Sequence, residues 1–330
     1  MLKDDHQKKT NGCCSASRSS AGDPSSQPLA VNERSGIRSE KTDRSGMVHI
    51  PGGTFLMGTN DREGFPADGE GPVHSVTVQP FYMDEHAVTN EDFECFIKET
   101  GYVTEAERFG WSYVFHLFVS AETGAKVSRV PVQTPWWLAV EGADWRHPEG
   151  PDSDLQGRRD HPVVHVSWHD AAAYCEWSGK RLATEAEWEF AARGGLVQKR
   201  YPWGDELKPN GEHRCNIWQG KFPVKDHASD GYSGTAPVRS FLPNGYGLYN
   251  MAGNVWEWCA DWFSPAYYTA GETDNPTGPK RGDSRVMRGG SYLCHSSYCN
   301  RYRVAARSKN TPDSSTGNTG FRCVISAQQS

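Results

Sequence analysis

The chain has 330 residues, of which 36% are hydrophobic, and its 12 tryptophans supply apolar surface for a sizeable buried core. This composition excludes disorder over the whole length. The formal net charge is -6 with acidic and basic residues interspersed, so neither a nucleic-acid footprint nor a basic membrane patch stands out. We therefore expect a small or peptide-like partner, no nucleic acid, no membrane and a monomer.

The compartment is predicted from what the sequence lacks. No apolar run approaches the roughly 18 residues that a membrane helix needs, and the start of the chain has no apolar signal-peptide core. We therefore expect a cytoplasmic protein. The nine cysteines contain no CxxC pair, and in a reducing compartment they favour thiol chemistry over a disulfide framework.

The composition changes at about residue 45. Residues 1–45 contain hardly any aromatic or long aliphatic side chains, so we predict a disordered tail. A single folded domain is predicted over residues 46–326. It opens with the strand-like "MVHIPGGTFLMG", and downstream the frequent Gly and Pro predict irregular loops on a small scaffold with few helices.

Helix signals stand out against these loops. In "TEAEWEFAARGG", Thr184 and Glu187 form a capping box and Gly194 supplies the stop. The segments 88–101 and 166–179 align without gaps, each with a helix cap near its start and a terminal glycine. This match suggests that the domain contains a duplicated helical element.

Two loops carry oxygen donors suited to a hard cation. Asn250 and Glu257 flank a glycine-containing turn, and Asn216 and Asp230 lie in a second such stretch. Calcium accepts carboxylate, amide and backbone oxygens together. Neither loop matches an EF-hand, so spacing alone leaves open that the first is a core loop that positions aromatic side chains.

His165 and His169 have the i, i+4 spacing of a helical metal site. Against this reading, His165 lies in the strand-like "HPVVHV", and no glutamate completes an HExxH or HxxxHxE pattern. A structural role is therefore favoured for both histidines.

Cys294 and Cys299 lie five residues apart in "GGSYLCHSSYCNRYRVAAR". A structural zinc site would need two further ligands. A disulfide would close only a small loop and would stabilise weakly. The third reading is a redox or soft-metal pair, because two thiolates with few other donors suit Cu(I). Nearby cations would favour the thiolate forms: Arg301, Arg303 and Arg307.

Several motifs together resemble one family. They are "RGGSYLCHSSYCNRYRVAARSKNTPDSSTGNTGFRC", "HPVVHVSWHDAAAYCEWSGKRLATEAEWEFAARGG", "CNIWQGKFP", "NGYGLYNMAGNVWEW" and "GPVHSVTVQPFYMDEHAVTN". The chain resembles the formylglycine-generating enzymes, or sulfatase-modifying factors, of the bacterial aerobic type, from about Met47 to Cys323. The two-cysteine segment is the most specific part of this resemblance.

The resemblance implies an α+β fold related to C-type lectins, with little regular secondary structure. It also implies the oxidation by dioxygen of a cysteine in a CxPxR-type motif of an unfolded sulfatase to Cα-formylglycine, with a thiol reductant supplying the remaining electrons. Cys294 and Cys299 would bind Cu(I), and a disulfide between them would be an oxidised, metal-free resting form. Ser291 and Tyr298 match pocket positions, and Trp256 would wall the site.

The resemblance further implies two structural calcium ions. One would bind Asn216, Ile217, Asp230 and Tyr232, and the other Asn250, Gly253, Val255 and Glu257. Of these residues, Ile217, Tyr232, Gly253 and Val255 would contribute backbone carbonyls.

The cysteine pattern departs from that of secreted animal members, which carry two structural bridges. Cys175 and Cys323 match one bridge, while Ala192 and Val304 replace both halves of the other. Whether Cys175 and Cys323 form a bond is left open. The remaining domain cysteines are interpreted as buried small hydrophobic residues: Cys95, Cys215 and Cys259.

One motif lies outside the domain. "CSASR", from Cys14 to Arg18, has the form of the substrate motif with alanine in place of proline. Chance occurrence in a serine-rich tail is the simpler reading. The alternative hypothesis is that the tail visits its own or a neighbouring active site.

Two other functions compete with the oxidase. A nonheme iron sulfoxide synthase shares this fold class but needs an HxxxHxE motif, which the chain lacks. A noncatalytic, calcium-dependent lectin-like module would use calcium and aromatic residues to hold a sugar or a peptide. Copper stoichiometry would separate this module from the oxidase.

Overall fold

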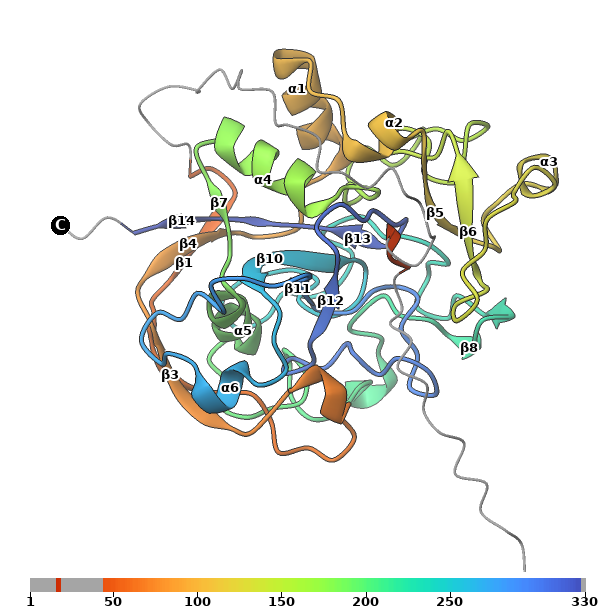
Figure 1. Ribbon diagram of the computed structural model, residues 1–330. Helices are drawn as coiled ribbons and strands as arrows, with labels where there is room; N and C mark the ends of the chain where they lie inside the picture. Colours follow the sequence, from red (N-terminus) through yellow and green to blue (C-terminus); the bar gives the residue numbers. More distant parts are fainter. Residues whose placement is uncertain (1–15, 19–43, 328–330) are drawn as a thin grey trace, which may run out of the picture.

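Two four-stranded sheets carry the fold in this computed structural model, which describes residues 16–18 and 44–327 (Figure 1). The first sheet is antiparallel with strand order β1-β4-β14-β7. The second has the order β12-β11-β10-β13, with β10 and β13 parallel. Their strands are β1 (Met47–Ile50), β4 (Phe81–Asp84), β7 (Arg181–Leu182), β10 (Trp256–Trp262), β11 (Arg285–Arg288), β12 (Ser308–Asn310), β13 (Thr319–Gly320) and β14 (Cys323–Ser326).

Three two-stranded hairpins extend from this framework. They are β2 (Gly53–Met57) with β3 (His74–Val78), β5 (Trp111–Phe115) with β6 (Trp137–Glu141), and β8 (Gly220–Lys221) with β9 (Lys225–Asp226). All five residues of β5 are buried, and its three aromatic residues join a separate core cluster. Most of the remaining chain forms loops, as the glycine and proline distribution predicts.

The helices are short. They are α1 (Asn90–Thr100), α2 (Glu105–Phe109), α3 (Ala121–Gly124), α4 (Trp168–Trp177), α5 (Glu185–Arg193) and α6 (Tyr267–Ala270), with 3-10 turns at Pro66–Asp68 and Pro209–Gly211. The predicted capping box of α5 is confirmed: Thr184 accepts from the Glu187 backbone, and Gly194 ends the helix with φ +56°. Glycine at such a position avoids the strain that a side chain would cause.

The two segments predicted to be duplicated form α1 and α4, which pack against each other. Each helix begins with a capping box, Thr89 with Asp92 in α1 and Ser167 with Asp170 in α4. The rings of Phe93 and Tyr174 stack with centroids 6.0 Å apart. The sequence match therefore corresponds to two equivalent helix entries around one core.

Buried ion pairs attach the C-terminal half of the chain to α5. Glu185 accepts from Arg307 at 2.6 and 2.8 Å and from Arg288 at 2.8 Å, while Glu189 accepts from Arg288 and Arg193, each at 2.6 Å. Burial by itself would raise the pKa values of both carboxyl groups, but the arginines lower them. These charges are compensated within the chain, as buried charges require.

Three residues of the tail predicted to be disordered are placed against the domain. Ala16 and Arg18 are buried and Ser17 is half-buried. Ala16 belongs to the β5 core cluster, and Arg18 lies over aromatic rings. These three residues depart from the expectation of disorder because the folded domain supplies long-range partners that tail composition does not reveal.

Within residues 16–18 and 44–327, no helix is both long enough and apolar enough to cross a membrane.

Candidate active site

Cys294 and Cys299 meet in the loop between β11 and β12. Their sulfur atoms are 3.0 Å apart, farther than the about 2.05 Å of a disulfide bond. A tight turn brings them together, because the backbone N–H groups of Cys299 and Asn300 both donate to the carbonyl of His295. Both cysteine side chains are fully buried. The predicted pair therefore exists as a spatial unit.

Ser291 lies directly beside this pair. Its backbone N–H points at the Cys294 sulfur at 3.4 Å, and its hydroxyl oxygen accepts from the Asn318 side chain at 2.9 Å. The carbonyl of Asn318 in turn accepts from the Trp256 backbone. The role of Asn318 could not be predicted from local spacing, because its partner Ser291 lies 27 residues away along the chain.

Trp256 and Tyr298 differ in how deeply they are buried. Trp256 is fully buried in the same core cluster as both cysteines, and Tyr298 packs against this cluster from a half-buried position. The Tyr298 ring stacks on Phe222 with centroids 4.4 Å apart and meets Trp136 edge-on at 4.9 Å. The structure thus brings the five predicted catalytic-site residues to one region.

The arginines that follow the pair do not supply uncompensated positive charge. Arg301 pairs with Asp68 at 2.6 Å, Arg303 forms two bonds to Glu70, and Arg307 forms two bonds to Glu185. The expectation that these cations favour the thiolate forms is therefore corrected. Their carboxylate partners come from distant parts of the sequence and neutralise them.

The first predicted calcium set forms one local cluster. Asp230 accepts from the backbone N–H groups of Ile217 at 3.0 Å and Tyr232 at 3.3 Å. Burial raises the pKa of the Asp230 carboxyl. The side-chain oxygen of Asn216 is buried without a hydrogen-bond partner among the described residues. An unsatisfied buried oxygen beside a carboxylate fits a hard cation.

The second set adjoins the first. Gly253 packs so closely that an added Cβ would lie 2.3 Å from the Asn216 carbonyl oxygen, and φ at Gly253 is +76°. The side-chain oxygen of Asn250 is also buried and unsatisfied within the described part of the chain. The Glu257 carboxylate accepts from Arg322 at 2.7 and 2.8 Å and from Trp188 at 2.7 Å. A cation bound there would share this carboxylate with Arg322.

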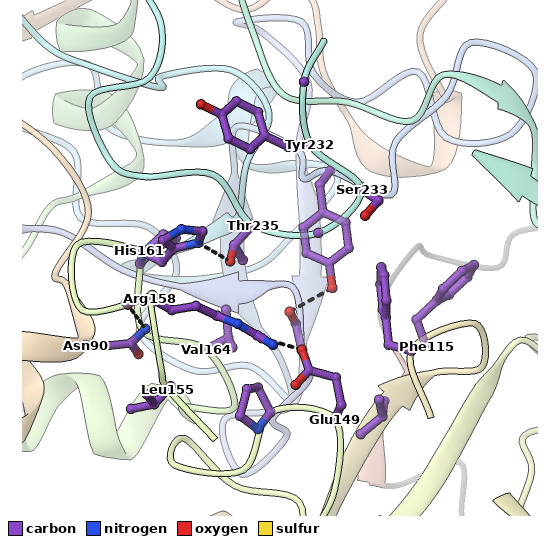
Figure 2. A pocket seen from close by; sticks show the side chains of 18 residues that line it. Asn90, Phe115, Glu149, Leu155, Arg158, His161, Val164, Tyr232, Ser233 and Thr235 are labelled. Atoms are coloured by element: carbon purple, nitrogen blue, oxygen red, sulfur yellow. Dashed lines mark hydrogen bonds and ion pairs between the residues drawn. The ribbon is translucent and has the colours of Figure 1, made fainter. Parts of the chain in front are cut away.

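A cavity of about 360 Å³ opens beside the first set. Figure 2 shows Tyr232, Ser233 and Thr235 on one side of it and the ion pair of Arg158 with Glu149 on the other. His161 bonds to Thr235 at 2.9 Å. The described residues that line this cavity include neither Cys294 nor Cys299, so it is distinct from the cysteine site.

The histidines have the favoured structural role. His165 is fully buried and bonds to Ser112 and to the Pro148 carbonyl, each at 2.8 Å. Burial lowers its pKa to about 4. His169 lies beside Glu105 at 3.1 Å. Within residues 16–18 and 44–327, no group of three His, Cys, Asp or Glu side chains is arranged to hold a metal.

The other cysteines differ in their surroundings. The sulfur atoms of Cys175 and Cys323 are 3.4 Å apart, in contact but without a bond. Cys215 and Cys259 are buried, as expected. Cys95 is exposed, so its assignment as a buried residue is wrong. It lies in α1 outside the buried positions, which are Asn90, Phe93, Phe96 and Ile97.

Comparisons with known proteins identify the family. Residues 34–327 match the family described as "Sulfatase-modifying factor enzyme 1-like domain". The chain is 64% identical over 282 residues to the formylglycine-generating enzyme of Streptomyces coelicolor, covering 86% of this chain and 90% of that protein. It is 62% identical over 290 residues to the formylglycine-generating enzyme of Thermomonospora curvata, covering 87% and 95%.

A solved structure agrees with this match. PvdO from Pseudomonas aeruginosa superposes with a TM-score of 0.62 at 26% identity, covering 85% of this chain and 94% of that one. The predicted family and its α+β fold with little regular secondary structure are confirmed. The chain belongs to the family of the sulfatase-modifying factor enzyme 1-like domain.

Proposed function

We propose that this protein converts a cysteine in a CxPxR-type motif of an unfolded sulfatase into Cα-formylglycine, using dioxygen and a thiol reductant. The observation that carries this proposal is the buried pair Cys294 and Cys299, with sulfur atoms 3.0 Å apart and the Ser291 N–H at 3.4 Å from one of them. The names of the two bacterial relatives support the same reaction.

The donor set at the pair fits Cu(I). Two buried cysteine sulfur donors suit a soft ion of low coordination number. When bound by Cys294 and Cys299, Cu(I) would supply affinity for the substrate thiol and activation of dioxygen.

The protein's own residues would hold this pair in place. Asn318 fixes the Ser291 hydroxyl at 2.9 Å, which positions the loop on which Cys294 lies. Trp256, buried in the same core cluster as the pair, would exclude water. The half-buried Tyr298 packs against that cluster and would border the substrate.

The reaction balances with the proposed co-substrates. The substrate Cβ loses two electrons and the thiol reductant supplies two more with two protons. Together these reduce one dioxygen. The products are the aldehyde, hydrogen sulfide and one water, so the carbon–sulfur bond breaks and a carbon–oxygen double bond forms.

Calcium is proposed as a structural ion. The two unsatisfied amide oxygens, Asn216 Oδ1 and Asn250 Oδ1, belong to the two predicted ligand sets. An unpaired buried amide oxygen costs about 1–3 kcal/mol, and a bound cation would remove that cost. Asp230 would provide the only carboxylate of the first set.

The test is mass spectrometry of a synthetic peptide containing CTPSR, incubated aerobically with the protein, Cu(I) and a thiol reductant. We expect the mass loss of a thiol-to-aldehyde exchange with the wild type and with Cys95→Ser, an exposed control. Cys294→Ser and Cys299→Ser should each abolish conversion. No conversion by the wild type, with no copper bound to the fully reduced protein, would instead support a noncatalytic lectin-like binding module.

A further inference from the structure

The backbone of Ala16–Arg18 is held by side chains of the folded domain. Asn310 donates to the Ala16 carbonyl at 2.9 Å, and the Tyr113 hydroxyl donates to the Ser17 carbonyl at 3.2 Å. The Arg18 N–H donates to the Ser314 hydroxyl at 2.8 Å. Recognition of three consecutive backbone groups is a common way to bind an extended peptide. The domain thus provides a built groove for this segment.

Arg18 occupies a pocket of its own in this groove. Its guanidinium lies 4.1 Å from the ring centroids of both Phe109 and Trp111. It donates to the carbonyls of Asp313 at 2.9 Å and Trp111 at 2.8 Å, and to the Ser315 hydroxyl at 3.1 Å. The side chain is 3% exposed. Two aromatic faces and a set of oxygen acceptors select an arginine.

The groove leads toward the cysteine pair. Ala16 shares a buried cluster with Leu293, which directly precedes Cys294, and with Trp218. The Trp218 backbone donates to the Cys294 carbonyl at 3.1 Å. Cys14 lies outside the described residues, but it precedes Ala16 by only two positions, a chain length that spans at most about 7 Å.

We propose that the N-terminal segment is a tethered, substrate-like occupant of the peptide groove. Arg18 fills the pocket for the substrate arginine and Ala16 takes the place of the motif's proline, so in this register the position of the reactive cysteine falls on Cys14. This proposal rests on the proposed function only in that an external CxPxR peptide would use the same groove. The segment then competes with that peptide and lowers its apparent affinity.

The first experiment measures this competition without turnover. A fluorescein-labelled peptide containing STPSR, in which serine replaces the reactive cysteine, is titrated with the full-length protein by fluorescence anisotropy. Arg18→Ala should bind it at least about threefold more tightly than the wild type, the change expected when two thirds of the grooves are occupied. Arg38→Ala, another tail arginine, is the matched control and should match the wild type. Equal affinity of all three proteins would overturn the competition.

The second experiment needs neither peptide nor copper. In a Cys13→Ser background, diamide oxidises neighbouring thiols by accepting two electrons and two protons for each disulfide formed. Non-reducing mass spectrometry should find Cys14 joined to Cys294 or Cys299, and Arg18→Ala should reduce that product several-fold. Cys14 joined equally often to the exposed Cys95, with no effect of Arg18→Ala, would overturn the proposal.

The two failures are distinguishable. Trapping of Cys14 at the pair without conversion of the CTPSR peptide would contradict the proposed oxidase while supporting the occupant. Conversion of that peptide, with no trapping and no effect of Arg18→Ala on binding, would support the oxidase and exclude the occupant.

Discussion

Arg307 and Arg18 both have buried guanidinium groups, but their hydrogen-bond partners differ in charge. Arg307 forms two bonds to the carboxylate of Glu185. Among the described residues, Arg18 donates to carbonyl and hydroxyl oxygens, and its guanidinium lies over two aromatic rings. One arginine is neutralised inside the core, and the other is held mainly by neutral groups.

The pKa shifts of the two groups follow this difference. Burial lowers the pKa of Arg18 to about 10, although the charge of Asp313 opposes the shift. Burial would also lower the pKa of Arg307, but Glu185 raises it above the usual value. The charge of Arg307 is therefore a fixed part of the fold. The charge of Arg18 is only partly compensated.

The largest effect on stability is expected from replacing Arg307. Arg307→Met should lower the free energy of unfolding by about 3–5 kcal/mol, because it removes one partner of a buried ion pair. Arg159→Ala, which breaks an exposed pair with Glu91, should change the free energy of unfolding far less, because water and salt screen the pair. Chemical denaturation of both variants measures the difference. Similar losses in the two proteins would refute a special role for burial.

The next largest effect is expected from calcium, because the ion would compensate the charge of the half-buried Asp230 carboxylate. Free calcium at about one hundred times its dissociation constant should stabilise the wild type by about 2.7 kcal/mol over a chelator-treated sample. Asn216→Ala should lose much of this increment, because it removes an oxygen of the first set. Thermal unfolding with and without chelator measures it, and exposed Asn60→Ala is the control. An unchanged increment in Asn216→Ala would exclude this ligand assignment.

The smallest effect concerns the buried carboxyl of Asp261, which forms no ion pair with any residue that the structure describes. Burial, and secondarily Glu185, raise the pKa of Asp261 to about 8. In the unfolded chain this acid titrates near 3.8, so its contribution to stability is fully present below that pH and is lost as pH rises through about 8. The stability of Asp261→Asn relative to the wild type should therefore increase by about 2 kcal/mol as the pH is raised from 6 to 8. Denaturation curves at both pH values, with the exposed Asp154→Asn as control, measure this gain; a pH-independent difference would argue against it.

Local features of the fold could be predicted from the sequence. The α5 capping box needs only Thr184, Glu187 and Gly194, all within eleven residues of one another. The paired cysteines are likewise a local feature, since the turn at His295 joins them. Such features depend on short-range backbone geometry, which residue type and spacing largely determine.

Long-range compensation could not be predicted. Arg303 bonds to Glu70, which lies 233 residues away in the sequence, and Arg18 bonds to Ser314, which lies 296 residues away. Residue type and spacing do not reveal these partners, so they indicate free cations beside the cysteines and a disordered tail. The "CSASR" motif was visible, but only the groove around Ala16 and Arg18 relates it to a site.

Arg18 belongs to the same chain as the groove that it occupies, and this sets its local concentration there. Residues 19–43 join it to the rest of the domain, so its local concentration at the groove depends on the length of that connection and not on how much protein a cell makes. The free energy of loop closure grows only slowly with loop length, by about 0.6 kcal/mol for each doubling. Insertions and deletions there would tune the competition in small steps while leaving every groove residue unchanged.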